Sequence, residues 1–426
     1  MLAVPFLLVL AAPPEAPAMA FSPPDLPAAE QVQQALAQSP LWAAAQDQQG
    51  VARYEAQELA SGPYEFSVQV QGQSRWVRGM GDYGEWWTTL QRPVRLPGKA
   101  ALDRQIGAAG EGVARAGFAE ARLGLAHELL GSWLDWLGSV ERERLLLEQQ
   151  RLAVENLAAV QKRLQAGDAA PMDVQAAEAD VEDITRSVVE ARTRKDMALA
   201  VLNGRFPAVG TQSPPPLSDP HPPTGALGDL RQAVLADNPR LQVLEMAVAR
   251  ARATAARARA ERWPDPTLAV FVASERGGDE RIGGGMITMP IPGPRRGQEQ
   301  ARTQALLRVA EDRLAAGRQM LEVQLASQMK AVEGNKAAFS AAQRASSAMT
   351  GQAQMMQRAY ALGEVDLQRL LLARRQARMA AVAALEARLA ALQATYGLLL
   401  DAHVLWNEGS GASELVDANG RLHGKQ

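Results

Sequence analysis

A helix–glycine turn–helix stretch occurs twice in this chain, and the two copies match position by position. The first copy covers residues 163–174 and the second covers residues 359–370. Gly167 and Gly363, which lie in the two turns, are 196 residues apart (363 − 167). A repeat period near half of the chain indicates internal duplication rather than a short solenoid repeat. The fold must therefore accommodate two long helical hairpins, each with a glycine at its tip.

The composition favours long helices over a thick globular core. The chain has 426 residues, of which 5% are aromatic and 22% are charged, with a formal net charge of −2. Ala, Leu, Gln, Arg and Glu are abundant, and these residues favour helices with coiled-coil contacts. The chain does not have the excess of basic residues that would indicate a nucleic-acid partner. The chain contains no cysteine, which excludes disulfides, thiolate metal sites and cysteine nucleophiles.

The chain divides into a leader, two repeats, a linker and a tail. Residues 1–20 are predicted to be a secretory signal peptide, because an apolar run ends in the small-x-small pattern Ala18-Met19-Ala20. The alternative is an ordinary apolar N-terminus. We expect the first repeat at residues 21–203 and the proline-rich linker at residues 204–228. The second repeat is expected at residues 229–408 and the flexible tail at residues 409–426. No later segment has about 18 consecutive apolar residues, so no membrane-spanning helix is expected.

Each half is predicted to contain one very long helix and a returning helix. Residues 100–164 and 298–362 have continuous helical patterns, each on the order of 95 Å long at 1.5 Å per residue. The returning helices are expected at residues 171–203 and 366–401. In the first of them the apolar residues follow a seven-residue period, as in Val174, Ala177, Val181, Ile184 and Val188. A 3.5-residue repeat predicts left-handed coiled-coil packing against neighbouring helices.

Two β-hairpins interrupt the helical pattern, at about residues 64–96 and 267–291. Apolar and polar residues alternate along residues 64–71, which predicts a strand with one apolar and one polar face. A glycine-rich loop at residues 72–84 and a second strand at residues 86–96 complete the first hairpin. The second hairpin repeats this order, with a strand at residues 267–273, a glycine-rich loop at 274–285 and a strand at 286–291. The apolar face would carry Tyr64, Phe66, Val68, Val70, Leu268, Val270 and Val272.

Four short strands per chain cannot form a stable free sheet with an exposed apolar face and two open edges. They either pack on helices in an α+β core or combine with other subunits into a closed barrel. Alternation of outward apolar and inward polar residues is typical of a membrane barrel with a wet lumen. Aromatic residues near the strands suit a membrane–water interface, although aromatics also fill soluble cores. These residues are Trp76, Tyr83, Trp86, Trp87 and Trp263.

With this ordered set of features the chain resembles the TolC-like outer membrane efflux proteins, over about residues 26–405. The shared order, present twice, is helix, strand pair, long helix, glycine turn and helix. Local features add to it: Asn238-Pro239 near the start of the second half, residues 263–268 before a strand, and Met289-Pro290-Ile291-Pro292 after one. Residues 264–296 look most like the subgroup that serves heavy-metal exporters of the cobalt–zinc–cadmium type.

The resemblance implies an architecture and a set of partners. The chain would be mostly α with a small β part, and would form a homotrimer. Four strands from each chain would form a 12-stranded outer membrane β-barrel, continued by an α-helical barrel through the periplasm. The partners would be a periplasmic adaptor, an inner-membrane efflux pump and outer-membrane lipid. Many relatives carry a lipidated cysteine that this chain lacks, so the resemblance implies anchoring through the barrel alone.

The glycine turns would then lie at the periplasmic tips of the assembly, where they close the aperture and dock the adaptor. Gly167 and Gly363 would supply the backbone freedom of the turns. Nearby acids either form a cation-favouring ring or cap the returning helices, and capping is preferred for Asp168 and Asp366. The acids are Asp168, Asp173, Glu364 and Asp366. Exposed apolar residues would receive the adaptor's helical tip: Leu164, Val365 and Leu367.

The sequence contains no constellation that indicates catalysis, a cofactor or a metal. The four histidines are scattered, at His127, His221, His403 and His423. The run Gly283-Gly284-Gly285 lacks the strand-then-helix context of a phosphate-binding loop and is predicted to lie in a hairpin loop. The sequence therefore predicts a passive channel rather than an enzyme. The alternatives are a periplasmic coiled-coil adaptor or scaffold without a membrane barrel, and an envelope enzyme for which no site is found.

Overall fold

The computed structural model describes residues 23–220 and 227–406. The predicted signal peptide and the predicted tail lie outside the described residues. The first half contains α1 (Ala29–Ala37), α2 (Pro40–Ser61), β1 (Ser67–Val77), β2 (Gly81–Pro93), α3 (Lys99–Gln165) and α4 (Pro171–Arg205). The second half contains α5 (Leu227–Ala236), α6 (Pro239–Ala260), β3 (Thr267–Glu275), the short helix η1 (Arg276–Gly278), β4 (Glu280–Thr288), α7 (Pro294–Ala361) and α8 (Leu367–Asp401). The same order of helices and strands occurs in both halves, as duplication requires.

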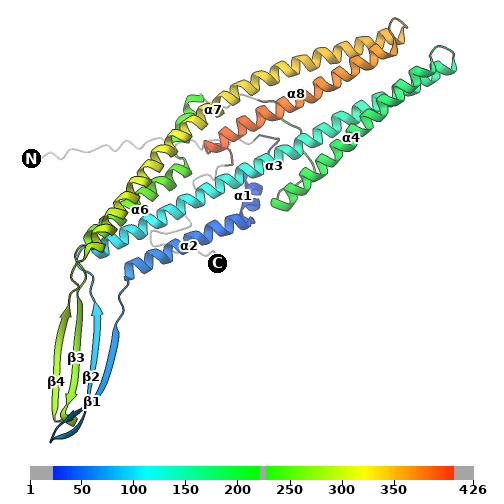
Figure 1. The fold of residues 1–426 in the computed structure, drawn as a ribbon. Helices are drawn as coiled ribbons and strands as arrows, with labels where there is room; N and C mark the ends of the chain where they lie inside the picture. The colour runs from blue at the N-terminus through cyan, green and yellow to red at the C-terminus, as the bar shows by residue number, and fades with distance from the viewer. Residues whose placement is uncertain (1–22, 221–226, 407–426) are drawn as a thin grey trace, which may run out of the picture.

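The molecule is elongated, with helices at one end and the sheet at the other (Figure 1). The hairpins α3–α4 and α7–α8 run in the same direction, while α2 packs on α3, and α6 packs on α3 and α7. The helix α3 has 67 residues and α7 has 68, so each is about 100 Å long. This mostly helical fold with a small antiparallel sheet confirms the predicted fold class. No helix in the described ranges has the length and apolar character needed to span a membrane.

Proline and a capping side chain start the second helix of each half. Ser39 Oγ accepts a hydrogen bond from the Leu41 amide (3.3 Å), and Asn238 Oδ1 accepts one from the Leu241 amide (3.1 Å). Proline follows each cap directly, where its missing N–H costs no helical hydrogen bond. Both caps satisfy amides that the first turn of a helix leaves without partners.

The main apolar core lies in the middle of the helical part. Its members come from α1, α3, α4, α5, α7 and α8, and they include Trp133 and Trp136 of α3. The segment at residues 206–220 has no helix, as expected for the linker, but its Phe206 and Leu217 are buried in this core. Arg388 Nε of α8 also donates a hydrogen bond to the Ser218 carbonyl (3.0 Å). The described part of the linker is therefore held against the helices.

Candidate functional site

The four strands form one antiparallel sheet in the order β1-β2-β3-β4, and most of its exposed apolar side chains lie on one face. Val68 pairs with Leu90, Leu90 pairs with Val270, and Leu268 pairs with Ile287. Directly paired residues, and every second residue along a strand, point to the same face. The exposed members of this apolar face are Val68, Val70, Leu90, Leu268, Val270, Val272 and Ile287. It thus includes five of the seven residues predicted for it.

No helix covers the apolar face in the described part of the chain. The strands contact one another and the short η1 turn, and no strand packs on an α-helix among those residues. This arrangement contradicts the alternative in which the strands belong to an α+β core. Figure 1 likewise shows the sheet extending away from the helices as a separate blade. The apolar side chains of this face are therefore exposed in the described chain.

The opposite face of the sheet is polar in β1 and carries an ion cluster. Gln73 Nε2 donates a hydrogen bond to Glu85 Oε2 (2.8 Å), and Arg75 Nε lies 3.1 Å from Glu85 Oε1. Together with the Arg276 amide, these groups hold a Glu85 side chain that is fully enclosed. The polar face can therefore contact water while its central carboxylate stays fixed.

The strands are longer and the loops shorter than predicted. The loop expected at residues 72–84 is wrong, because β1 and β2 are paired from Ser67 to Val77, and only residues 78–80 turn between them. Backbone pairing does not require the apolar alternation that ends near Gln71, and cross-strand polar pairs continue the sheet. The same error affects the second hairpin, where β4 starts at Glu280.

The triple-glycine run lies inside β4 and not in the predicted loop. Gly284 pairs with Phe271 of β3. A Cβ added at Gly284 would lie 2.6 Å from the Phe271 ring, so the aromatic side chain occupies the space above the glycine. Glycine in a strand often marks such a close approach. The turn itself uses Gly277 and Gly278, whose φ values are +68° and +109°.

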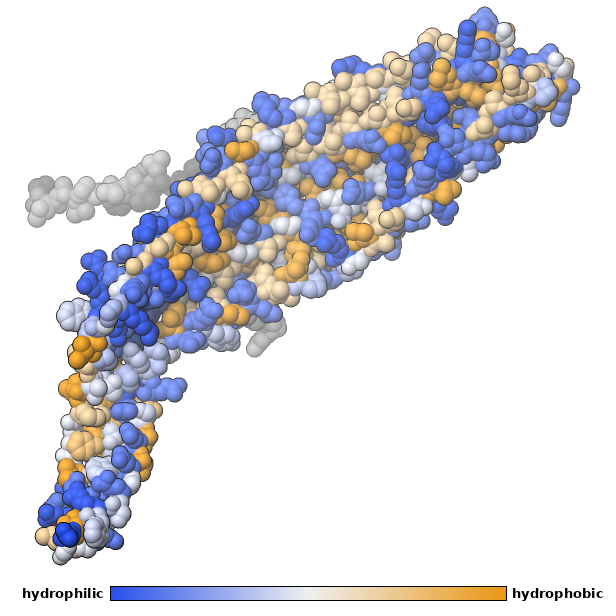
Figure 2. All heavy atoms as spheres, viewed as in Figure 1, coloured by the Kyte–Doolittle hydropathy of each residue, from blue (hydrophilic) through white to orange (hydrophobic). Residues whose placement is uncertain are grey.

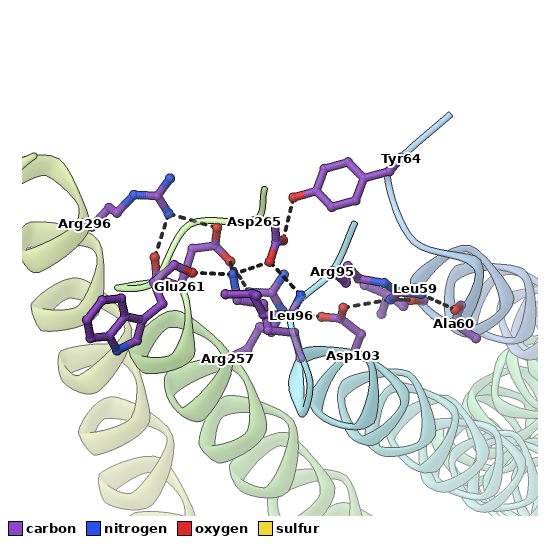
Figure 3. Close-up of polar contacts among 12 residues, drawn as sticks. Leu59, Ala60, Tyr64, Arg95, Leu96, Asp103, Arg257, Glu261, Asp265 and Arg296 are labelled. Carbon is purple, nitrogen blue, oxygen red and sulfur yellow. Dashed lines mark hydrogen bonds and ion pairs between the residues drawn. The ribbon is translucent and has the colours of Figure 1, made fainter. Parts of the chain in front are cut away.

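A network of buried charges joins the sheet to the helices (Figure 3). Lys99, the first residue of α3, is only 1% exposed. Its Nζ lies 2.8 Å from Asp265 Oδ1 and 3.2 Å from Glu261 Oε2, and it donates to the Trp263 carbonyl at 2.6 Å. Asp265 also accepts hydrogen bonds from the Leu96 amide (2.9 Å). The ammonium and the carboxylate are thus both enclosed and both fully partnered.

Tyr64 belongs to this network and not to the lipid-facing set predicted for it. It precedes β1, is half-buried, and donates its hydroxyl hydrogen bond to Asp265 Oδ2 at 2.7 Å. The alternating pattern placed Tyr64 on the apolar face because it lies four residues, an even number, before Val68. The strand, however, starts three residues after Tyr64. Phe66 also precedes β1; it is exposed, with the Arg92 guanidinium 4.8 Å from its ring centroid.

Two arginines extend the network into the neighbouring helices. Arg95, just after β2, donates to the Leu59 carbonyl (3.0 Å) and the Ala60 carbonyl (2.7 Å) at the end of α2, and it pairs with Asp103 at 2.9 Å. Carbonyls in the last turn of a helix have no helical donor, so the guanidinium satisfies them. Arg257 of α6 binds the other oxygen of Asp103 at 2.7 Å. Three helices therefore converge on one set of charges.

The charges shift one another's pKa values. Burial raises the pKa of Asp265, but hydrogen bonds from Lys99, Leu96 and Tyr64 outweigh it and hold that pKa below its usual range. Burial and the hydrogen bond to the Asp265 carboxylate raise the pKa of Tyr64 to about 12. Asp265 therefore stabilises the fold above its ordinary pKa, and this contribution is lost as the pH falls through the lowered value. No local sequence pattern predicts this network, because its direct contacts join residues up to 201 positions apart.

The predicted aromatic residues fall into two groups. Trp76, Trp86 and Trp263 are exposed; Trp76 and Trp86 share the apolar face, and Trp263 lies just after α6, where the sheet meets the helices. Trp87 points to the polar face and is half-buried. Tyr83, near the hairpin turn, donates its hydroxyl hydrogen bond to the Met80 carbonyl (3.1 Å). Exposed tryptophans therefore lie near both ends of the sheet.

The two glycine turns have the same geometry. Gly167 and Gly363 have φ values of +82° and +77°, the left-handed region that favours glycine. The Asp168 amide donates to the Arg163 carbonyl (2.8 Å), and the Glu364 amide donates to the Ala359 carbonyl (2.9 Å). This six-residue hydrogen bond, together with a glycine in the left-handed region, is the Schellman ending of a helix. Both tips lie at the end of the molecule farthest from the sheet (Figure 1).

The acids at the tips have different local roles. Asp366 caps α8, because its Oδ1 accepts a hydrogen bond from the Arg369 amide (2.8 Å). Asp168 does not cap α4; the structure places Ala170 at that position, and Asp173 Oδ2 accepts from the Ala170 amide (3.0 Å). The predicted cap at Asp168 is wrong because the turn continues for two residues beyond it. Asp168 and Glu364 are exposed.

Of the three apolar tip residues that were predicted to be exposed, one is buried and two are half-buried. Leu367 is 3% exposed and packs with Val160, Tyr360 and Leu370 in a small core between the two hairpins. Its place at the start of α8 turns it toward α3 and α7, so the expectation that Leu367 is a free docking residue is wrong. Leu164 and Val365 are half-buried. The exposed apolar residues of the tips are Met172 and Leu362, which no periodic pattern singled out.

Among the described residues, no group of three or more histidine, aspartate or glutamate side chains could hold a metal ion. His127 is nevertheless paired, with Nε2 2.7 Å from Asp401 Oδ1. His403 Nε2 lies 2.9 Å from the Asp237 carbonyl oxygen. These histidines link helices and their connections in the middle of the molecule.

Comparison with known proteins identifies the fold. No family model and no curated protein matches the chain. Among solved structures, the chain is similar to the CmeC outer membrane channel of Campylobacter jejuni, with 17% identity, a TM-score of 0.72, and 90% of this chain and 87% of that chain covered. The chain has the fold of an outer membrane channel. The VceC outer membrane protein of Vibrio cholerae matches with a TM-score of 0.74 at 14% identity, over 90% of this chain and 100% of VceC.

The similarity to channel structures extends over about nine-tenths of the chain. The open state of the MtrE outer membrane channel of Neisseria gonorrhoeae gives a TM-score of 0.73 at 17% identity, with 91% of each chain covered. Coverage of this extent cannot come from the long helices alone. Among the described residues, the apolar face of the sheet and the two tips both carry exposed apolar side chains.

Proposed function

We propose that this chain forms the outer membrane channel of a tripartite efflux system and conducts substrate passively from the periplasm to the exterior. The observation that carries the proposal is the match of nearly the entire chain to outer membrane channels, with 87–100% of those chains covered. A match to the helices alone would also suit a coiled-coil adaptor. The match here covers 90% of the chain, more than the long helices alone supply, and no described α-helix covers the apolar face of the sheet.

The sheet has the dimensions of a membrane barrel segment. Its strands have 11, 13, 9 and 9 residues, and a strand that crosses a membrane needs about 9–11. The outer strands β1 and β4 each have one edge that pairs with no other strand among the described residues. Three copies would join these edges into a closed barrel of twelve strands, which pairs every backbone group as a bilayer requires. The apolar face would then contact lipid, with Trp76, Trp86 and Trp263 near the interfaces.

The tips are the proposed contact with a periplasmic adaptor and, through it, an inner-membrane pump. Leu164, Val365, Met172 and Leu362 supply apolar surface there, and Gly167 and Gly363 shape the turns. In a trimer, Asp168, Asp173, Glu364 and Asp366 would each occur three times and surround the aperture with negative charge. This charge would favour cations at the entrance.

The resemblance of residues 264–296 to the heavy-metal subgroup extends the proposal to the substrate. We infer a pump that exports divalent cations of the cobalt, zinc and cadmium class. Deleting the gene in its own host should lower the tolerated concentrations of these ions, and restoring the full chain should recover them. Unchanged metal tolerance together with lower drug tolerance would contradict the metal assignment and leave the channel proposal intact.

The proposed function is tested by locating the protein in the cell. The full chain should be recovered from the outer membrane of a Gram-negative host, and should run in detergent with three times the mass of the mature chain. Recovery as a soluble periplasmic monomer would contradict the channel and favour the adaptor or scaffold alternative. Since the matched proteins are channels and the described residues contain no catalytic arrangement, we propose no enzyme activity and no cofactor.

A further inference from the structure

A basic recess lies where the helices meet the sheet. It has a volume of about 610 Å³ and is formed by the end of α6 and the segment that leads into α7. Three arginines and one tryptophan line it, together with two prolines and two glycines: Arg259, Arg262, Arg296, Trp263, Pro292, Pro294, Gly293 and Gly297. A recess of this size accommodates a small ligand or a lipid headgroup.

The recess carries positive charge that no side chain of the described residues neutralises. Arg296 donates from Nη1 to the Glu261 carbonyl (2.6 Å) and to Glu261 Oε1 (2.9 Å), so it is committed to the buried network. Arg259 and Arg262 are exposed, and within the described ranges their guanidinium groups form no ion pair or hydrogen bond. The nearby Asp265 is held by Lys99. Two guanidinium groups are therefore free to bind an anion.

Apolar side chains border the same recess. Trp263 is 72% exposed, and Ile291, which precedes the recess residue Pro292, is 94% exposed. Met289 is also exposed. Figure 2 shows a hydrophilic band over the helix ends, with hydrophobic side chains on the adjoining part of the sheet. A ligand that fits this arrangement carries a negative group at one end and an apolar body at the other.

We propose that the recess binds the phosphodiester headgroup of an anionic lipid in the inner leaflet of the outer membrane. The guanidinium groups of Arg259 and Arg262 hold the phosphate oxygens, for which their planar donors are well suited. Trp263 lies at the glycerol level, where an indole ring has both apolar and polar neighbours. The inference rests on the proposed function, because it needs the sheet to lie in a bilayer and the helix ends to lie at its periplasmic surface.

The test measures lipid retention by the full-length protein, purified in detergent and stripped of lipid. Phosphatidylglycerol and phosphatidylcholine are added separately, and bound lipid per trimer is counted by native mass spectrometry. The wild type should retain phosphatidylglycerol about 10-fold better than phosphatidylcholine. The double variant Arg259→Gln/Arg262→Gln should lose this preference, since each basic group near an anionic surface is worth about a factor of five to ten. The matched control Arg308→Gln/Arg313→Gln changes two exposed arginines farther along α7 and should retain it.

Each outcome decides between specific readings. Equal retention of the two lipids by the wild type overturns the inference without any variant. Retention unchanged in a double variant that still forms trimers also overturns it. Displacement of phosphatidylglycerol by millimolar inorganic phosphate would assign the recess to a free anion and overturn the lipid assignment. In all of these cases the trimer still inserts and conducts, whereas a failure of the proposed function would show as a protein that does not insert at all.

Discussion

Lys99 and Asp265 carry opposite charges at positions where both side chains are only 2% exposed. Removing charges from water is costly, so such a pair persists only when hydrogen bonds satisfy the remaining donors and acceptors. Here the Trp263 carbonyl, the Leu96 amide and the Tyr64 hydroxyl complete the set. The pair fixes the start of α3 against the segment before β3, which sets the direction of the sheet relative to the helices.

Replacing one member of this pair should destabilise the protein strongly. Lys99→Met leaves the Asp265 carboxylate buried without its cation, and the expected loss is about 3–5 kcal/mol. Thermal unfolding of the detergent-solubilised protein measures the loss. Arg302→Gln is the control, because Arg302 and Glu299 are paired at a similar distance (2.7 Å) but are exposed, and it should change little. Equal effects of the two variants would contradict the assigned role of the buried network.

The raised pKa of Tyr64 predicts a loss of stability at alkaline pH. The pKa is about 12 in the folded chain against an ordinary value of 10.0. A group whose pKa is raised by folding stabilises the fold fully below the ordinary value, and the stabilisation is lost as the pH rises toward 12. Tyr64→Phe should therefore show a smaller decrease of melting temperature between pH 9 and 11.5 than the wild type. Parallel curves for the two proteins would rule out this coupling.

For individual residues, the sequence predicted which side chains share a face better than it predicted which distant side chains contact one another. Alternation along a strand is local, so the spacing of apolar residues was sufficient to place five side chains on one face. These are Val68, Val70, Leu268, Val270 and Val272. The Lys99–Asp265 pair spans 166 residues and has no local pattern. Leu367 was misassigned because an apolar residue beside a glycine turn can face either solvent or the partner hairpin. Only the packing of α3 against α8 determines which of these two directions the side chain takes.

At the scale of elements, the two tips share one turn and differ in the cap that follows. Asp366 caps α8 directly, whereas α4 depends on the reverse bond from the Ala170 amide to Asp173. Both bonds satisfy groups at helix starts, where carboxylates also suit the helix dipole. Asp168 makes neither bond, and its side chain is exposed.

Removing the cap of α8 should loosen the second tip. Asp366→Ala should cost about 1 kcal/mol, because the Arg369 amide loses its acceptor. Hydrogen exchange of the first turn of α8 should accelerate by about fivefold to tenfold. Asp168→Ala, in the equivalent turn of the first repeat, should leave the exchange of α4 unchanged. Faster exchange in Asp168→Ala than in Asp366→Ala would contradict these assignments and support the predicted cap at Asp168.

A charged residue on the apolar face of the sheet should prevent membrane assembly. Val270→Arg places a charge at the centre of the apolar face, at an expected cost of about 2–4 kcal/mol if that face contacts the bilayer core. The fraction of protein recovered in the outer membrane should fall steeply, and Val68→Arg should behave alike. Gln69→Arg, on the polar face beside Val68, should assemble normally. Normal assembly of all three variants would contradict a lipid-facing sheet.

The elements were largely predictable because each has a local period. The helical hairpins follow from their seven-residue apolar repeat, and the helix ends follow from Pro171, Gly167 and Gly363. The strand ends were not predictable in this way. Beyond Gln71 the strand is held by backbone pairing and by polar pairs such as Gln73 with Glu85, and these pairs carry no apolar alternation.

For the whole molecule, the chain is one unit of a larger assembly under the proposed function. Within residues 23–220 and 227–406, nothing covers its apolar sheet face or pairs with the outer edges of β1 and β4. Two similar halves with two similar tips would give six tips in a trimer, and thus nearly sixfold symmetry at the aperture. The sequence could reveal the duplication through the 196-residue spacing, but the joining of chains depends on edges that only the structure defines.

The most direct measurement is the electrical conductance of planar lipid bilayers to which the purified, full-length trimer is added. The proposed channel should produce discrete current steps of uniform size. Such steps should be absent when the Val270→Arg variant is added at the same concentration. A bilayer that remains silent with the wild type, while the protein stays soluble and monomeric without detergent, would contradict the outer membrane channel.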